Sequence, residues 1–204
     1  MNNSIEKLAE LFAKFPGIGE RQSRRFVYFL LKQDQSYLQS LIESVKTLKQ
    51  NISECTSCHR FFQTDGNELC DICASSATDK SILMIVEKDS DLESIRKSKS
   101  YNGLYFILGG LVPIVEKNTE KLVRSKELFE KVKKDVASGL KEIILAFSLN
   151  PQGDNTDIYT RQMLSSLREE YQIKISSLGR GLSTGTELEY SDSDTIKNAL
   201  KNRQ

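Results

Sequence analysis

The chain has 204 residues, with 29 Lys and Arg against 28 Asp and Glu and a formal net charge of +1. A balance this even gives no global field that would mark a nucleic-acid or membrane partner, so such a function must rest on local clusters. No apolar run approaches the roughly 18 residues that a membrane span needs, and the N-terminus has no apolar signal core. We therefore expect a cytoplasmic protein with no membrane partner.

The first fifty residues are predicted to be helical. Apolar residues recur at helical spacing from Ile5 to Phe15, and the breaker Pro16–Gly19 follows them. A second apolar helix is expected from Phe26 to Leu31 and a third from Leu38 to Leu48. The pattern indicates a helical N-terminal domain with a glycine turn between its first two helices.

That turn is the candidate nucleic-acid site. Gly17 and Gly19 permit φ > 0 and close approach by another chain, and the amides that open the next helix can bind phosphate. Arg21, Arg24 and Arg25 add positive charge beside those amides, and Arg21 and Arg25 share a helix face. The segment predicts a helix-hairpin-helix that holds the DNA backbone without reading sequence. The alternative is a tight connection within a helical bundle.

Four cysteines, the only ones in the chain, form two Cys-x2-Cys pairs, Cys55 with Cys58 and Cys70 with Cys73. Two such pairs complete a tetrahedral shell and leave no site for water or substrate. The spacing predicts one structural Zn²⁺ per chain. Two disulfides are the alternative, but they suit small secreted domains, and nothing else here is typical of secretion. His59 follows Cys58, and we expect it beside the filled shell rather than in it.

The rest of the chain alternates short apolar runs with helical stretches. Runs buried on both faces are typical of strands in a parallel sheet, so we predict an α/β layer architecture. The expected strands are 81–86, 103–108, 142–147 and 172–177. The expected helices are 91–98, 119–137, 156–170 and a short one near the C-terminus, ending near 203. The basic run Lys131–Lys134 is expected to be a solvated face of its helix.

The order of these parts resembles the bacterial recombination mediator family RecR. The resemblance rests on segments 15–25, 55–73, 85–95, 105–110 and 180–190, the last reading Arg-Gly-Leu-Ser-Thr-Gly-Thr-Glu-Leu-Glu-Tyr. It implies that the α/β part is a Toprim domain, Rossmann-like and shared with topoisomerases and primases, and that the protein is not an enzyme. It also implies four-subunit rings that act with RecO, and often RecF, to load RecA in recombinational DNA repair.

The resemblance implies that the chain has four regions and that the protein binds DNA and protein partners. They are a helix-hairpin-helix domain (1–51), a four-cysteine zinc-finger module (52–76), a Toprim-like domain (77–178) and a C-terminal motif and helix used in subunit pairing (179–204). The expected partners are double- and single-stranded DNA, RecO with RecF as a further candidate, and further copies of the chain in a dimer or tetramer ring.

The acidic site of the Toprim-like domain departs from the family pattern. A Toprim enzyme holds Mg²⁺ between a glutamate, which Glu87 matches, and a later acidic pair. Here Gln152 stands where the first of that pair is expected, and only Asp154 keeps a carboxylate. We therefore expect no Mg²⁺ and interpret Glu87, Asp89, Gln152 and Asp154 as a vestigial cluster, which the resemblance implies is a RecO contact.

The loop after the second expected strand also departs from the family pattern. The segment after Gly109-Gly110 lacks the glycines of the family, so its loop is expected to differ in shape. The main alternative function is a Toprim-type metal-dependent nuclease or another phosphoryl-transfer enzyme, with Glu87, Asp89 and Asp154 on the metal. The other is a protein-binding adaptor whose glycine turn serves subunit pairing.

Overall fold

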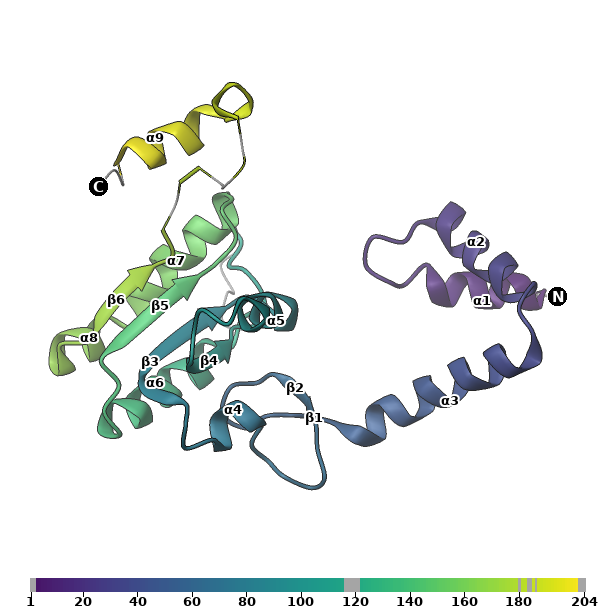
Figure 1. Cartoon of the computed structure of the whole chain (residues 1–204), viewed down its shortest axis with the longest axis horizontal. Helices are drawn as coiled ribbons and strands as arrows, with labels where there is room; N and C mark the ends of the chain where they lie inside the picture. The colour runs from purple at the N-terminus through teal and green to yellow at the C-terminus, as the bar shows by residue number, and fades with distance from the viewer. Residues whose placement is uncertain (1–2, 116–121, 180, 183–184, 186, 202–204) are drawn as a thin grey trace. The chain divides into compact units, whose positions relative to one another are not determined.

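A computed structural model describes residues 3–115, 122–179, 181–182, 185 and 187–201. The chain divides into two compact units, Met1–Ile52 and Ser53–Gln204 (Figure 1). Among the described residues, no helix is both long and apolar enough to cross a membrane.

The first unit contains α1 (Ser4–Phe12), α2 (Glu20–Leu30) and α3 (Gln35–Asn51), which confirms the three predicted helices. The Asn3 side chain caps α1 by accepting a hydrogen bond from the Ile5 amide at 3.3 Å. Phe12 and Phe26 pack edge to face with ring centroids 5.7 Å apart and hold α1 against α2.

Helix α3 is capped but not buried. Asp34 accepts hydrogen bonds from the Tyr37 amide at 2.8 Å and the Ser36 hydroxyl at 2.7 Å, and these bonds lower the pKa of its carboxyl. No residue of α3 is buried. Most of its large apolar side chains are exposed, among them Leu41, Ile42, Val45 and Leu48.

The second unit begins with the cysteine module. Strands β1 (Ile52–Glu54) and β2 (Phe61–Gln63) form a two-stranded sheet, and the single-turn helix α4 (Asp71–Ala74) follows. Phe62 is the buried residue of β2 and packs with the cysteines in a small core of their own.

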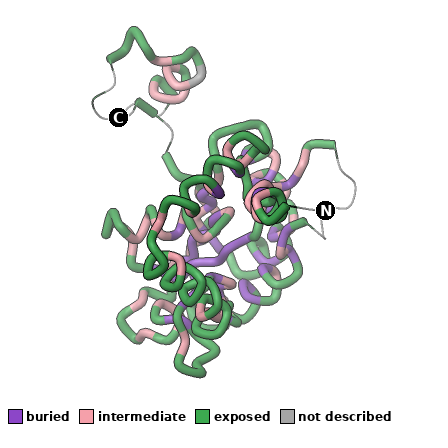
Figure 2. Tube along the Cα trace, turned by 90° about the vertical axis from the view of Figure 1, so that its right-hand side faces the viewer, coloured by how far each residue is buried: buried purple, intermediate pink, exposed green. Residues whose placement is uncertain are grey.

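A four-stranded parallel sheet forms the centre of this unit. Its strands are β3 (Asp79–Val86), β4 (Gly103–Ile107), β5 (Glu142–Ala146) and β6 (Lys174–Ser177). They lie in the order β4-β3-β5-β6, and all three pairings are parallel, which confirms the predicted α/β architecture. The strands are the main buried part of the unit (Figure 2).

Helices cover both faces of the sheet, so the unit has three layers. On one face, α6 (Ser125–Ala137), α7 (Pro151–Met163) and α8 (Ser165–Tyr171) pack with Leu128, Leu164 and Leu167 in the larger core. On the other face, α5 (Asp89–Ser98) packs Leu92 against the strand side chains that point away from the larger core. These side chains are Met84, Val86, Tyr105 and Ile107.

Two predicted helices have different bounds. The stretch predicted at 156–170 begins at Pro151, because the Asn150 side chain caps α7 by accepting a bond from the Gly153 amide at 2.8 Å. It is interrupted at Leu164, which separates α7 from α8. The stretch predicted from 119 begins as α6 at Ser125, and 116–121 are outside the described residues.

The C-terminal part contains the 3₁₀ turn η2 (Leu188–Tyr190) and helix α9 (Ser193–Lys201). Four residues of the C-terminal family signature, Arg180, Ser183, Thr184 and Thr186, are outside the described residues.

Candidate functional site

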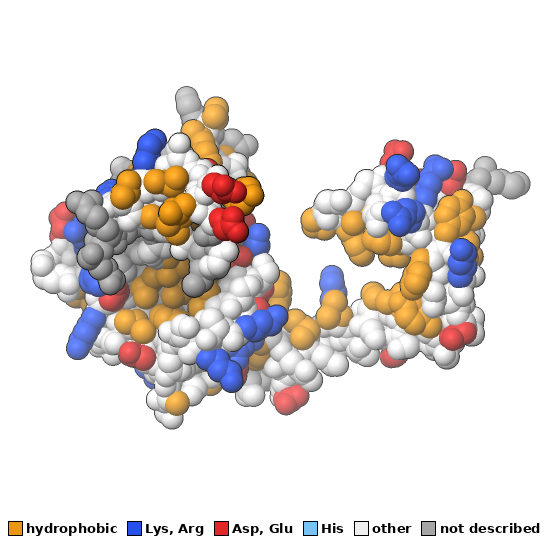
Figure 3. Space-filling view, turned by 45° about the horizontal axis from the view of Figure 1, so that its top comes forward, with side chains coloured by type: hydrophobic (Ala, Val, Ile, Leu, Met, Phe, Trp, Pro, Cys, Tyr) orange, Lys and Arg blue, Asp and Glu red, His pale blue; other side chains and the backbone are white. Residues whose placement is uncertain are grey.

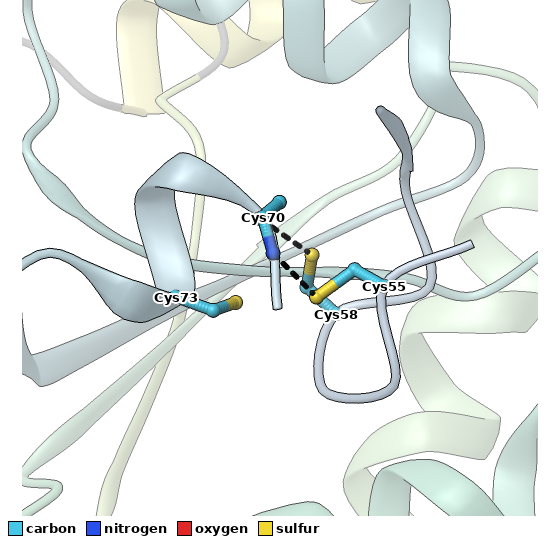
Figure 4. A group of neighbouring side chains, drawn as sticks. All are labelled: Cys55, Cys58, Cys70 and Cys73. Carbon is cyan, nitrogen blue, oxygen red and sulfur yellow. Dashed lines mark hydrogen bonds between the residues drawn. The ribbon is translucent and has the colours of Figure 1, made fainter. Parts of the chain in front are cut away.

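The four cysteines converge on one point (Figure 4). Cys55 and Cys58 lie in the turn between β1 and β2, Cys70 precedes α4, and Cys73 belongs to that helix. Their sulfur atoms all lie within 4.8 Å of one another, so together they can hold a metal ion. All four are free thiols, and three are fully buried.

The four cysteine side chains lie close enough to change one another's pKa. The thiols of Cys58, Cys70 and Cys73 lower the pKa of Cys55 by hydrogen bonding to its thiolate, and the bond with Cys55 raises the pKa of Cys58. The Cys70 amide also points at the Cys55 sulfur, at 3.4 Å. Thiols this close cannot all ionise unaided, whereas a bound divalent cation stabilises every thiolate at once. A closed set of four sulfur ligands suits zinc.

His59 lies beside this cluster. Its Nδ1 is 2.6 Å from Glu54 Oε1, and its ring packs edge to face on Phe106 of β4, with centroids 5.2 Å apart. Its backbone has φ 61, a left-handed conformation that the tight turn after Cys58 requires. His59 is not a member of the group of side chains that could hold the metal.

Lys131 contacts the cysteine module, a role that sequence reasoning missed. Its ammonium group bonds the Ser57 hydroxyl at 3.0 Å and Asp135 Oδ2 at 2.9 Å, and its side chain is only 8% exposed. The prediction of a solvated face is therefore wrong for Lys131, although Lys133 and Lys134 are exposed. The i,i+4 spacing to Asp135 was the available signal, but it does not reveal burial.

The predicted nucleic-acid residues form an exposed segment of the first unit. Gly17 has φ +76, which uses the freedom of glycine, whereas Gly19 has φ −88 and is the N-cap of α2. No atom lies within 4 Å of where a side chain would begin at either glycine, so another chain can approach closely. Arg21, Arg24 and Arg25 are exposed. Figure 3 shows basic side chains gathered on this unit beside a large hydrophobic area.

The predicted acidic residues lie at the carboxyl ends of the strands but do not form a metal group. Glu87 Oε2 accepts a hydrogen bond from the Ser148 hydroxyl at 3.2 Å. Asp89 Oδ1 accepts one from the Phe61 amide at 2.8 Å, which ties this carboxylate to the cysteine module. Gln152 and Asp154 are exposed in the first turn of α7. Within the described part of the chain, only the cysteines are grouped closely enough to hold a metal.

The loop that departs from the family pattern is fixed to α7. The Val112 amide donates to the hydroxyl of the buried Thr156 at 2.8 Å, and the Asn155 side chain donates to the Val112 carbonyl at 3.0 Å. The segment without glycines therefore has its own anchor beside the acidic residues. Its next two apolar side chains, Ile114 and Val115, are exposed.

Comparison with known proteins identifies the parts. Residues 81–179 match the model of the Toprim domain, and residues 181–204 match the model of the C-terminal part of RecR. The chain is 34% identical over 199 residues to Recombination protein RecR of Bacteroides thetaiotaomicron, an alignment that covers 98% of this chain and 92% of the relative. It is 32% identical over 203 residues to Recombination protein RecR of Chloroherpeton thalassium, covering 99% and 97% of the two chains. The four-cysteine module, the parallel sheet and these full-length matches together show that the chain belongs to the RecR family.

Proposed function

We propose that this chain is a non-catalytic, DNA-binding mediator of recombinational DNA repair that acts with RecO, and with RecF as a further partner, to load RecA. The relatives are named recombination proteins, and they align over nearly the whole chain. The observation that carries the DNA-binding part is the exposed turn with Gly17 in a left-handed conformation, followed by Arg21, Arg24 and Arg25 on the solvent side of α2.

The turn suits a phosphate backbone for two physical reasons. The opening amides of α2 have no intrahelical partner and can donate to phosphate oxygens. The bare glycines let the backbone of a nucleic acid come close, and the arginines add attraction that does not depend on base sequence. The buried side of α2, with Ser23 and Val27, faces the rest of its own unit, so the arginines are free to face DNA.

The metal in this proposal is one structural Zn²⁺ per chain. A module of about 20 residues cannot bury enough surface to fold alone. Metal binding to such a module supplies roughly 10–16 kcal/mol of folding free energy. Cys55, Cys58, Cys70 and Cys73 would hold the ion, and its closed shell leaves it no catalytic step.

Self-association is part of the same proposal. Helix α3 exposes a row of apolar side chains and buries none of its residues, which is unusual for a helix of a lone subunit. Each subunit would hold DNA weakly through its arginines. A dimer or tetramer ring that faces one duplex raises the effective concentration of the sites and so the avidity. The C-terminal motif and α9 are proposed as a second pairing region.

A partner role for the acidic residues is favoured over a nuclease. Gln152 is neutral, and Asp89 already accepts a hydrogen bond from the cysteine module. Glu87 and Asp154 are the other two carboxylates of the cluster, and we propose that they contact a basic surface of RecO. Incubation with nicked and single-stranded DNA plus Mg²⁺ or Mn²⁺ tests the alternative, because a nuclease would cleave and a mediator would not.

The DNA proposal is tested by replacing Arg21 and Arg25 with alanine. If each arginine makes about one phosphate contact, the slope of log K against log salt should flatten by roughly 0.9 per residue on duplex DNA. The matched control is Lys133→Ala with Lys134→Ala, which removes the same charge from an exposed face of α6. An affinity and slope unchanged by the arginine substitutions would refute the site and favour a protein-binding adaptor.

A further inference from the structure

The two halves of the cysteine cluster contact different parts of the parallel sheet unit. The first knuckle (Cys55–Cys58) contacts α6 and β4, and the second knuckle (Cys70–Cys73) contacts α5. A metal ion held by both knuckles would therefore join elements that lie on opposite faces of the sheet.

The first knuckle is fixed by three contacts. Its Ser57 hydroxyl bonds the buried ammonium group of Lys131 on α6 at 3.0 Å. The Cys58 carbonyl accepts a hydrogen bond at 2.9 Å from the Ile107 amide at the end of β4, so one of the clustered cysteines is bonded to the sheet directly. Arg124, which precedes α6, lies 3.4 Å from Glu54, just before the knuckle.

The second knuckle is fixed to α5 by charge and by apolar packing. Asp71, between Cys70 and Cys73, binds Arg60 at 2.8 Å and Arg96 of α5 at 2.9 Å. Ile72 packs against the cysteine core and also against the core beneath α5 that contains Val86 and Leu92.

The connection between the knuckles holds the start of α5. The Phe61 amide in β2 donates to Asp89 Oδ1, and Asp89 is the first residue of α5, two residues after Glu87. The position of this acidic turn therefore depends on the fold of a module that is too small to fold without a metal.

We propose that the cysteine cluster is a metal-dependent lock on the acidic turn Glu87–Asp89 and on the first turn of α5. With metal bound, both knuckles and β2 hold the turn in place. When the metal leaves, the module unfolds and the turn and α5 lose these contacts. Because such coupling is reciprocal in free energy, contacts that hold Asp89 must also raise the affinity for the metal. Differences in affinity between variants of one site appear mostly in the dissociation rate, so we expect the same contacts to slow release of the metal. The inference rests on the proposed zinc site and does not depend on DNA or RecO.

The test measures zinc release from the full-length protein to a chromophoric chelator. Asp89→Ala removes the acceptor of the Phe61 amide, and we expect release at least about tenfold faster, as the loss of a hydrogen bond to a charged group implies. Asp89→Asn keeps an oxygen acceptor and should restore most of the slow release. The matched control is Asp91→Ala, which removes an acidic side chain from the same turn of α5, where Asp89 and Asp91 are the two acidic residues.

A second measurement uses the unaltered chain. Hydrogen exchange at residues 87–98 should accelerate when zinc is removed, while exchange in β5 and β6 should change little. Equal release rates for Asp89→Ala and Asp91→Ala, or exchange at residues 87–98 that is indifferent to zinc, would overturn the lock. If the purified chain binds no stoichiometric zinc, the proposed metal centre itself fails. If one zinc is bound and the rates are equal, only the coupling fails.

Discussion

The Phe61 amide donates a hydrogen bond to Asp89 Oδ1 at 2.8 Å, across 28 positions of sequence. Asp89 lies at the carboxyl end of β3, where the sequence predicts a member of an acidic cluster, yet the structure uses it to hold β2 of the cysteine module. A carboxylate occupied in this way is less available to a metal at the sheet edge. The same contact gives the start of α5 a partner from outside the sheet.

Gly153 allows the close packing of α7 on the preceding turn. A Cβ atom at this position would overlap the backbone carbonyl of Ser148, and backbone atoms cannot move aside as a flexible side chain can. We expect Gly153→Ala to destabilise the protein by about 1–3 kcal/mol, the usual cost of forcing an extra group into packed structure. Urea unfolding measures the loss. Gly179→Ala, where no atom lies within 4 Å, is the control and should leave the midpoint nearly unchanged.

Two neighbouring tyrosines should respond differently to loss of the hydroxyl. Tyr101 donates to the Leu104 carbonyl at 2.8 Å, so Tyr101→Phe should cost about 1 kcal/mol. The Tyr105 hydroxyl is buried and has no hydrogen-bond partner among the described residues, so Tyr105→Phe should be neutral or stabilising. Thermal unfolding of both variants measures the change in stability. If Tyr105→Phe destabilised the protein as much as Tyr101→Phe, the Tyr105 hydroxyl could not be without a hydrogen-bond partner.

Lys131 should be important for stability although it belongs to a basic run. Replacement by alanine removes the buried ammonium group that pairs with Asp135 and bonds Ser57. We therefore expect the free energy of unfolding to fall by about 1–3 kcal/mol. Lys134→Ala on the exposed side of the same helix should change stability by no more than about 0.5 kcal/mol. Similar melting temperatures for the two variants would show that the ammonium group of Lys131 stabilises nothing.

Zinc affinity should fall on acidification. The ligands bind as thiolates, whereas a free cysteine thiol has an ordinary pKa of about 8.5 and is mostly protonated near neutral pH, so protons must leave when metal binds. Metal-bound thiols have a lowered pKa, so their contribution to stability is present at high pH and is lost as pH falls. Each displaced proton weakens apparent affinity about tenfold per pH unit. Competition with a chelator of known pH dependence measures this slope, and a pH-independent affinity would exclude thiolate ligation.

The sequence predicted what local spacing determines. The Cys-x2-Cys pairs predicted a cluster, and the apolar run 81–86 lies within β3, because each is a property of adjacent residues. The Phe61 partner of Asp89 and the Ser57 partner of Lys131 are not predictable from spacing, because these contacts span 28 and 74 positions and only the packed fold determines them. The early start of α7 is set by Asn150 as the N-cap and Pro151 in the first turn, and the apolar spacing of the following residues does not carry that signal.

Helix α3 has a consequence for how the protein behaves at different concentrations. A helix of 17 residues with no buried side chain has its cap at Asp34, the ring contact of Tyr37 with Phe29 and its own propensity, which together give marginal stability in water. Further stability of α3 would then come from whatever covers Leu41, Val45 and Leu48. If that cover is another copy of the chain, folding of α3 obeys mass action, and dilution alone would melt it while the parallel sheet stays intact.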